Sequence, residues 1–176
     1  MKRSISFWQV IGFGVTSLLG TLLHFLYAWL GESSFAAIFS AVNESTWEHM
    51  KIFFLPTFAF ALIQSKLFKE YEDFWCVKLK GILLGLTLIP VIFYTYNGAI
   101  GKSPDWINIS IFFISAGAVY FYETKMFENR SKNHCAPRFS LAILWIIAVL
   151  FVVFTFITPQ LEIFRDPNTG AFGING

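Results

Sequence analysis

The stretch Asn43-Glu44-Ser45-Thr46-Trp47-Glu48-His49-Met50-Lys51 decides how this chain is interpreted, because it runs directly into the apolar segment 52–63. Those twelve apolar residues rise roughly 18 Å as a helix, whereas the hydrocarbon layer of a membrane is about 30 Å thick. A helix that spans the membrane here must therefore draw polar residues into one leaflet, and Glu48, His49 and Lys51 are the nearest. A charged residue in that position costs about 2.5–3.5 kcal/mol and usually faces a cavity or a partner. The stretch is therefore the predicted site.

The composition is that of a membrane protein. Of the 176 residues, 56% are hydrophobic, 19% are aromatic and only 14% are charged, which excludes an ordinary soluble domain. Besides the segment 45–64, four others have about the length of a membrane-spanning helix, namely 6–30, 77–96, 106–122 and 139–157. We therefore expect a single all-α transmembrane domain over residues 1–176, built as a polytopic bundle of about five helices.

The basic residues predict the orientation of the bundle. With five spans, ten of them fall on one side of the membrane, namely Lys2, Arg3, Lys66, Lys69, Lys78, Lys80, Lys125, Arg130, Lys132 and Arg138, whereas only Lys102 and Arg165 clearly fall on the other. Basic residues accumulate on the cytoplasmic side. The N-terminus should therefore be cytoplasmic and the C-terminus outside. The small net charge of +2 comes from these loops, so we expect membrane lipids as partners and no nucleic acid.

The polar residues before segment 52–63 have a helical spacing. If the helix already includes residue 44, then Glu44, Glu48 and Lys51 lie at i, i+4 and i+7 and form one stripe, with Ser45 and His49 beside it. A purely structural interpretation is also available, because Ser45 and Glu48 have the spacing of a capping box and acids are favoured near a helix N-terminus. That interpretation leaves His49 and Lys51 unexplained.

The first span carries a second polar residue that is predicted to face the protein. Gly12, Thr16, Gly20, His24 and Ala28 recur every fourth residue and share one helical face. Small residues allow helices to approach closely in membranes, so this face should be turned toward other helices. His24 should then lie at a depth similar to that of His49, although a buried neutral histidine bonded to a backbone carbonyl would satisfy the same pattern.

We therefore predict a polar pocket at the outer end of the bundle. The candidate ligand-binding residues are His24, Asn43, Glu44, Glu48, His49 and Lys51, and the candidates for catalysis are Glu44, Glu48 and His49. We assign no metal to the chain. A metal-dependent version of the site would use His24, His49 and either Glu44 or Glu48, but the spacing is not the His-Glu-x-x-His pattern of zinc proteases. The sequence leaves open whether residues 31–42 and 162–176 cover the pocket.

The chain also resembles a known group of proteins. The run 39–51, together with His24 and the tail 166–174, is similar to an uncharacterised bacterial family of small integral membrane proteins with a domain of unknown function. The motif that carries the resemblance is Val-Asn-Glu-Ser-x-Trp-Glu-His. The resemblance implies a multi-pass protein of the bacterial cytoplasmic membrane, and it supplies no activity, substrate or cofactor.

Three classes of function fit these features. The first is binding of a small polar molecule or a lipid headgroup in an outward-facing intramembrane pocket. The second is an intramembrane hydrolase or transferase that uses Glu and His side chains, with or without a metal, on a lipid. The third is a structural or assembly subunit. The sequence does not decide whether the protein is an enzyme, which cofactor it binds, or whether it forms an oligomer or joins a partner subunit.

Overall fold

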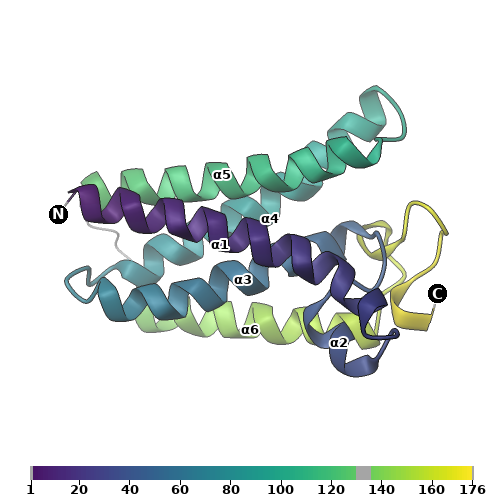
Figure 1. Ribbon diagram of the computed structural model, residues 1–176, viewed down its shortest axis with the longest axis horizontal. Coiled ribbons are helices and arrows are strands. Elements are labelled where there is room, and N and C mark those ends of the chain that lie inside the picture. Colours follow the sequence, from purple (N-terminus) through teal and green to yellow (C-terminus); the bar gives the residue numbers. More distant parts are fainter. Residues whose placement is uncertain (1, 130–135, 176) are drawn as a thin grey trace.

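The computed structural model describes residues 2–129 and 136–175, and within them the chain is all-helical (Figure 1). Its helices are α1 (Lys2–Trp29), α2 (Ser34–Phe39), α3 (Thr46–Leu67), α4 (Phe74–Ala99), α5 (Asp105–Asn129) and α6 (Pro137–Phe156), followed by the 3₁₀ turns η1 (Glu162–Phe164) and η2 (Gly173–Asn175). The described residues contain no β-strand, only one isolated bridge between Arg165 and Phe172. The two ends of the chain lie at opposite ends of the bundle (Figure 1).

Five of these helices are long and apolar enough to cross a membrane, which confirms the predicted all-α bundle. They cover Ile5–Trp29, Thr46–Leu67, Phe74–Ala99, Asp105–Asn129 and Pro137–Phe156. The protein is therefore a multi-pass membrane protein. The fourth span is longer than the predicted segment 106–122, because Glu123 is fully buried and its carboxylate accepts hydrogen bonds from Lys78 and Gln9, at 2.6 and 3.2 Å. Because the carboxylate is paired with the Lys78 ammonium, α5 can continue inside the bundle past residue 122.

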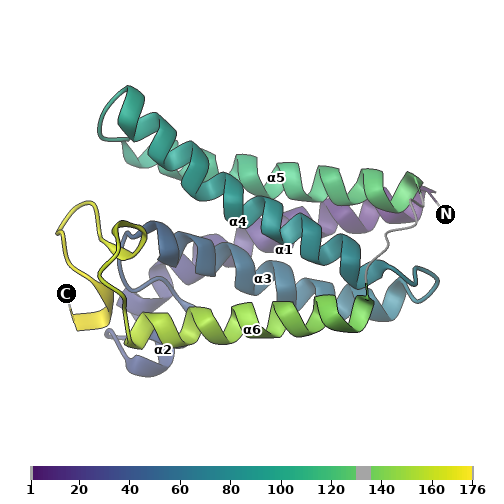
Figure 2. The same ribbon diagram turned by 180° about the vertical axis from the view of Figure 1, so that it is seen from behind.

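Helix α3 is the central element of the bundle. It packs against α1, α4 and α6, and Figure 2 shows α3 running between α6 and the α4–α5 hairpin. Its Phe53 and Phe54 are fully buried in the main apolar core. Because the first half of α3, residues 46–58, has no exposed residue, the polar residues at its start are held inside the protein.

One end of the bundle, which we call the pocket end, carries α2, the C-terminal tail and the α4–α5 connection. The tip of the α4–α5 hairpin leans away from α6 and from the tail at this end (Figures 1 and 2). The tail instead packs near the start of α3, where Asn43 Nδ2 donates to the Gly173 carbonyl at 3.1 Å. Residues 166–170 of the tail form a turn, in which Gly170 N donates to the Asp166 carbonyl at 2.8 Å.

Candidate functional site

The start of α3 is fixed by short-range hydrogen bonds. Ser45 is the N-cap, and its hydroxyl accepts from Glu48 N at 3.3 Å. Asn43 Oδ1 accepts from Ser45 N at 2.9 Å, which forms a turn just before the helix. Because α3 begins at Thr46, Glu44 lies outside the helix. The predicted stripe of Glu44, Glu48 and Lys51 is therefore wrong for Glu44, which points in a different direction from Glu48.

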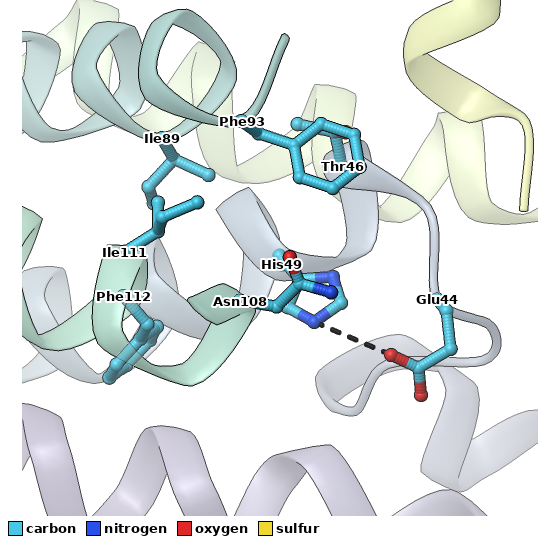
Figure 3. Close-up of a pocket in the computed structure, with 8 residues that line it drawn as sticks. All are labelled: Glu44, Thr46, His49, Ile89, Phe93, Asn108, Ile111 and Phe112. Carbon is cyan, nitrogen blue, oxygen red and sulfur yellow. Dashed lines mark ion pairs between the residues drawn. The ribbon is translucent and has the colours of Figure 1, made fainter. Parts of the chain in front are cut away.

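Glu44 lies between the two histidines of the predicted site. Its Oε2 atom is 3.4 Å from His24 Nε2 and 3.6 Å from His49 Nε2, and the two imidazole ring centres are 5.3 Å apart. Figure 3 shows the Glu44 carboxylate directed at the His49 ring. We call His24, Glu44 and His49 the His–Glu–His cluster. It joins α1 to α3 at the pocket end, as the predicted inward orientation of His24 required.

The cluster is partly buried, with side-chain exposures of 27% for His24, 41% for Glu44 and 17% for His49. The hydrogen bond from His24 to Glu44 holds the pKa of the Glu44 carboxyl below its usual value, so the carboxylate form is favoured. His49 Nδ1 donates to the Ser45 carbonyl at 3.0 Å, whereas the buried Nδ1 of His24 has no hydrogen-bond partner. The Glu44 carboxylate therefore faces two imidazoles that differ in one respect: Nδ1 is hydrogen-bonded in His49 but not in His24.

Glu48 and Lys51 form a separate pair on another side of α3. Lys51 Nζ donates to Glu48 Oε2 at 2.6 Å, to the Ala37 carbonyl at 3.0 Å and to Thr155 Oγ1 at 2.8 Å. The Glu48 carboxylate also accepts from Val42 N at 3.1 Å. All three protons of the ammonium thus have partners inside the protein. The pair ties α2 and α6 to α3.

A cavity of about 510 Å³ lies beside the His–Glu–His cluster. All three cluster residues line it, but Asn43, Glu48 and Lys51 do not. Its other polar lining residues are Thr21, Asp105, Asn108 and Asn168, and its large apolar ones are Phe25, Ile52, Ile109, Phe112 and Phe113. A second, much smaller cavity of about 20 Å³ is lined by Glu44 and His49 among others (Figure 3). That volume is about enough for one water molecule.

Several polar lining residues were not among the candidate ligand-binding residues. Asp105 and Asn108 come from the start of α5, and Asn168 comes from the C-terminal tail. They lie more than fifty positions along the chain from Glu44, so no local spacing links them to it. The available signal was their position at the end of a predicted span, which places polar side chains near the same membrane surface.

A second buried polar cluster lies away from the pocket and was also missed. Lys78 and Glu123 are both fully buried and 2.6 Å apart, and Gln9 connects Glu123 to Gln64 by hydrogen bonds of 3.2 and 3.3 Å. The residue types gave a hint, because Gln9 and Gln64 occupy apolar spans. The pairing itself needed the helices to be placed side by side.

Comparison with known proteins identifies only a family. A family model described as "Family of unknown function (DUF6512)" matches residues 1–174, nearly the whole chain. A search of curated proteins and a search of solved structures found no match. The geometry of the site is therefore the available basis for a function.

Proposed function

We propose a function from the pocket itself, because this chain belongs to the DUF6512 family, whose function is unknown. The protein binds a lipid through its headgroup in the 510 Å³ cavity at the pocket end. Cavities of about 300–1,000 Å³ are typical of small-molecule sites, and most combine apolar walls with a few polar groups. The observation that carries the proposal is the mixed lining of this cavity, which combines several polar groups with large, partly exposed apolar side chains.

Several of the apolar lining residues are substantially exposed. Phe25 on α1 and Ile109 and Phe113 on α5 line the cavity, and they are 47%, 57% and 37% exposed. An acyl chain can lie along these residues while the headgroup reaches His24, His49 and Glu44. An amphipathic ligand is thus favoured over a purely polar solute, because a polar solute would leave the apolar wall in contact with water.

The charges of the lining favour a particular headgroup. Among the residues that line the cavity are two acids, Glu44 and Asp105, and the asparagines Asn108 and Asn168, but no lysine or arginine. Lys51, the basic residue nearest to Glu44 in the sequence, is 0% exposed and forms an ion pair with Glu48. The protein alone should therefore prefer headgroups with hydroxyl or amino groups over anionic ones.

A second candidate is an intramembrane hydrolase or transferase that acts on such a lipid. The observation that favours it is the Glu44 carboxylate, which faces the cavity between two imidazoles. A carboxylate or imidazole in this position can remove a proton from a water molecule or a lipid hydroxyl. Incubation of the purified protein with the bound lipid, followed by mass spectrometry, separates turnover from binding.

The proposal includes the location of the pocket on the outer face of a bacterial cytoplasmic membrane. The end of the bundle opposite the pocket carries the N-terminus and the α3–α4 connection (Figure 1), and the chain has Lys66 and Lys69 beside that connection. The positive-inside rule assigns this end to the cytoplasm. A periplasmic reporter enzyme fused after residue 176 should be active, and inactivity of that fusion would reverse the orientation.

Ile109→Trp tests the lipid site directly, because the larger side chain would occupy the cavity. Ile114→Trp is the matched control, since Ile114 is also on α5 and 59% exposed but does not line the cavity. The measurement is binding of short-chain diacylglycerol, phosphatidylethanolamine and phosphatidylglycerol to the purified protein in detergent. We expect Ile109→Trp to weaken binding at least about tenfold, or about 1.4 kcal/mol, and the control to bind like the wild type.

The order of the three lipids is a second outcome of the same experiment. Diacylglycerol and phosphatidylethanolamine should bind more tightly than the anionic phosphatidylglycerol. Equal binding by both tryptophan variants, with no dependence on the headgroup, would mean that the lipids only coat the apolar surface, and the proposal would then be abandoned.

A further inference from the structure

The His–Glu–His cluster brings three metal-ligating side chains from three parts of the chain to one point. His24 comes from α1, His49 from α3, and Glu44 from the connection between α2 and α3. One ligand atom from each lies within 4.8 Å of the other two. Both imidazoles approach the same carboxylate oxygen, at 3.4 and 3.6 Å. The arrangement is therefore convergent on a small volume at the edge of the cavity.

The Ser45 carbonyl determines which nitrogen of His49 is free. A carbonyl oxygen only accepts hydrogen bonds, so His49 Nδ1, which lies 3.0 Å from it, must be the donor. In the neutral imidazole, Nε2 then carries a lone pair and faces Glu44 Oε2, which also has only lone pairs. Two acceptors 3.6 Å apart repel each other, and a cation that binds both of them removes this repulsion.

The same contact is the usual outer-shell support of a metal site. A histidine that binds a metal through one nitrogen generally donates its other N–H to a carboxylate or a backbone carbonyl. This bond fixes the tautomer and the orientation of the ring. For His49 the supporting carbonyl belongs to the N-cap of the same helix, so the formation of α3 itself orients the ring.

We propose that His24, Glu44 and His49 bind a divalent transition-metal ion, with Zn²⁺ as the best match. Two imidazoles and one carboxylate are a ligand set of catalytic zinc sites, in which a fourth position stays open for water or substrate. Around a tetrahedral zinc with bonds of about 2.0–2.1 Å, ligand atoms are roughly 3.3 Å apart. The two distances to Glu44 Oε2 are close to that value. Nitrogen ligands favour zinc over magnesium or calcium.

Glu48 does not belong to this ligand set, although it was a candidate ligand in the sequence. Its carboxylate accepts from Lys51 at 2.6 Å, from Val42 N at 3.1 Å and from Thr155 at 3.1 Å. A metal would have to displace these partners and leave the buried Lys51 ammonium without its counter-ion. The proposed site therefore uses Glu44, and not Glu48, as its carboxylate ligand.

The open position of the ion would face the cavity that all three ligands line. The metal site stands on its own geometry, and only the identity of the molecule at the open position rests on the proposed function. For a lipid, that molecule would offer a hydroxyl, carbonyl or phosphoryl oxygen, which a bound zinc polarises as a Lewis acid. The ion would also add positive charge to a cavity that has no lysine or arginine in its lining.

The test is a metal titration of the full-length protein in detergent, after treatment with a chelator and without added lipid. Calorimetry with Zn²⁺ should give one ion per chain, and Co²⁺ should give the visible absorption of a tetrahedral site. Mutation of an outer-shell partner typically weakens metal binding about 10–100-fold. We expect a larger loss of zinc affinity from each variant that removes a ligand, namely Glu44→Gln, His24→Ala and His49→Ala. Asp105→Asn is the matched control, because it makes the same carboxylate-to-amide change in the cavity lining and should bind normally.

The variants Glu44→Asp and His24→Cys keep a metal-binding atom at each position, so they should still bind zinc. They show whether a variant that fails to bind has lost a ligand or has failed to fold. Absence of stoichiometric binding to the wild type, or unchanged binding in all three variants that remove a ligand, overturns the metal site. Ile109→Trp should retain zinc while it loses lipid. Zinc binding without lipid binding would therefore refute the proposed function alone, and lipid binding without zinc would refute the metal site alone.

Discussion

The Lys51 ammonium lies 2.6 Å from the Glu48 carboxylate, less than one turn away on α3, and the two side chains are only 0% and 3% exposed. This pair belongs to the polar stretch 43–51 that begins the second span, yet it does not line the cavity. The polar side chains of residues 43–51 thus have two different roles. Glu48 and Lys51 hold helices together, and Glu44 and His49 face the cavity.

We expect Lys51→Met to destabilise the protein strongly. The change leaves the Glu48 carboxylate buried without its cation, and breaking a buried pair in this way typically costs about 3–5 kcal/mol. The measurement is the free energy of unfolding in detergent. The double variant Lys51→Met with Glu48→Leu should recover part of the loss, because no unpaired charge remains. Wild-type stability of the single variant would contradict the burial of the pair.

We expect Glu123→Gln to destabilise the protein while Glu128→Gln does not. Both glutamates are on α5, but Glu123 is paired with the fully buried Lys78 at 2.6 Å, whereas Glu128 is 22% exposed and 4.0 Å from Lys125. The loss for Glu123→Gln should approach the about 3–5 kcal/mol of a broken buried pair, and that for Glu128→Gln should be about 0–1 kcal/mol. Thermal unfolding of both variants checks this, and equal losses would refute it.

We expect Gly85→Ala to destabilise α4 packing. A Cβ atom at this position would overlap the Phe53 ring, and extra atoms in a packed core cost about 1–3 kcal/mol. Gly98→Ala on the same helix is the control, because a Cβ there meets nothing within 4 Å. The control should be neutral or gain up to about 1 kcal/mol from helix propensity. A stable Gly85→Ala variant would show that the helices are less closely packed at this point.

We expect Asp166→Ala to release the C-terminal tail. The Asp166 carboxylate accepts from Glu44 N at 3.3 Å and from Asn168 N at 2.7 Å, so it connects the tail to the residue at the centre of the site. Hydrogen bonds to a charged group contribute about 1.5–3 kcal/mol. Hydrogen exchange should become faster in residues 162–175. Glu162→Ala is the control and should have little effect, because the Glu162–Arg165 pair is exposed. Equally fast exchange of the tail in the Glu162→Ala variant would contradict the role of Asp166.

The sequence predicted the bundle well because membrane spans are encoded locally. Four of the five spans are runs of about 17–25 mostly apolar residues, and no long-range contact is required to recognise them. The exception was the end of α5. From the sequence, Glu123 is expected in a loop, because a charged residue usually ends a membrane span. In the structure it is buried and paired with Lys78, so the helix continues past it.

The site was predicted in outline only. The four-residue repeat on α1 correctly indicated that His24 faces the protein, and the two histidines lie side by side with ring centres 5.3 Å apart. The role of Glu44 was not predictable from helical spacing, because the helix starts after it. The hydrogen bond from Ser45 N to Asn43 Oδ1 closes a turn there, and Glu44 is thereby directed at His24 and His49.

The sequence alone thus determined that the chain crosses a membrane several times, and that the start of its second span is too polar to face lipid. The tertiary structure decided which polar groups meet. Hydropathy depends on residues that are neighbours in the chain, so it can be read directly from the sequence. The partner of a buried carboxylate on another helix depends on which helices pack side by side, and only the folded arrangement assigns Lys78 to Glu123 and the two histidines to Glu44.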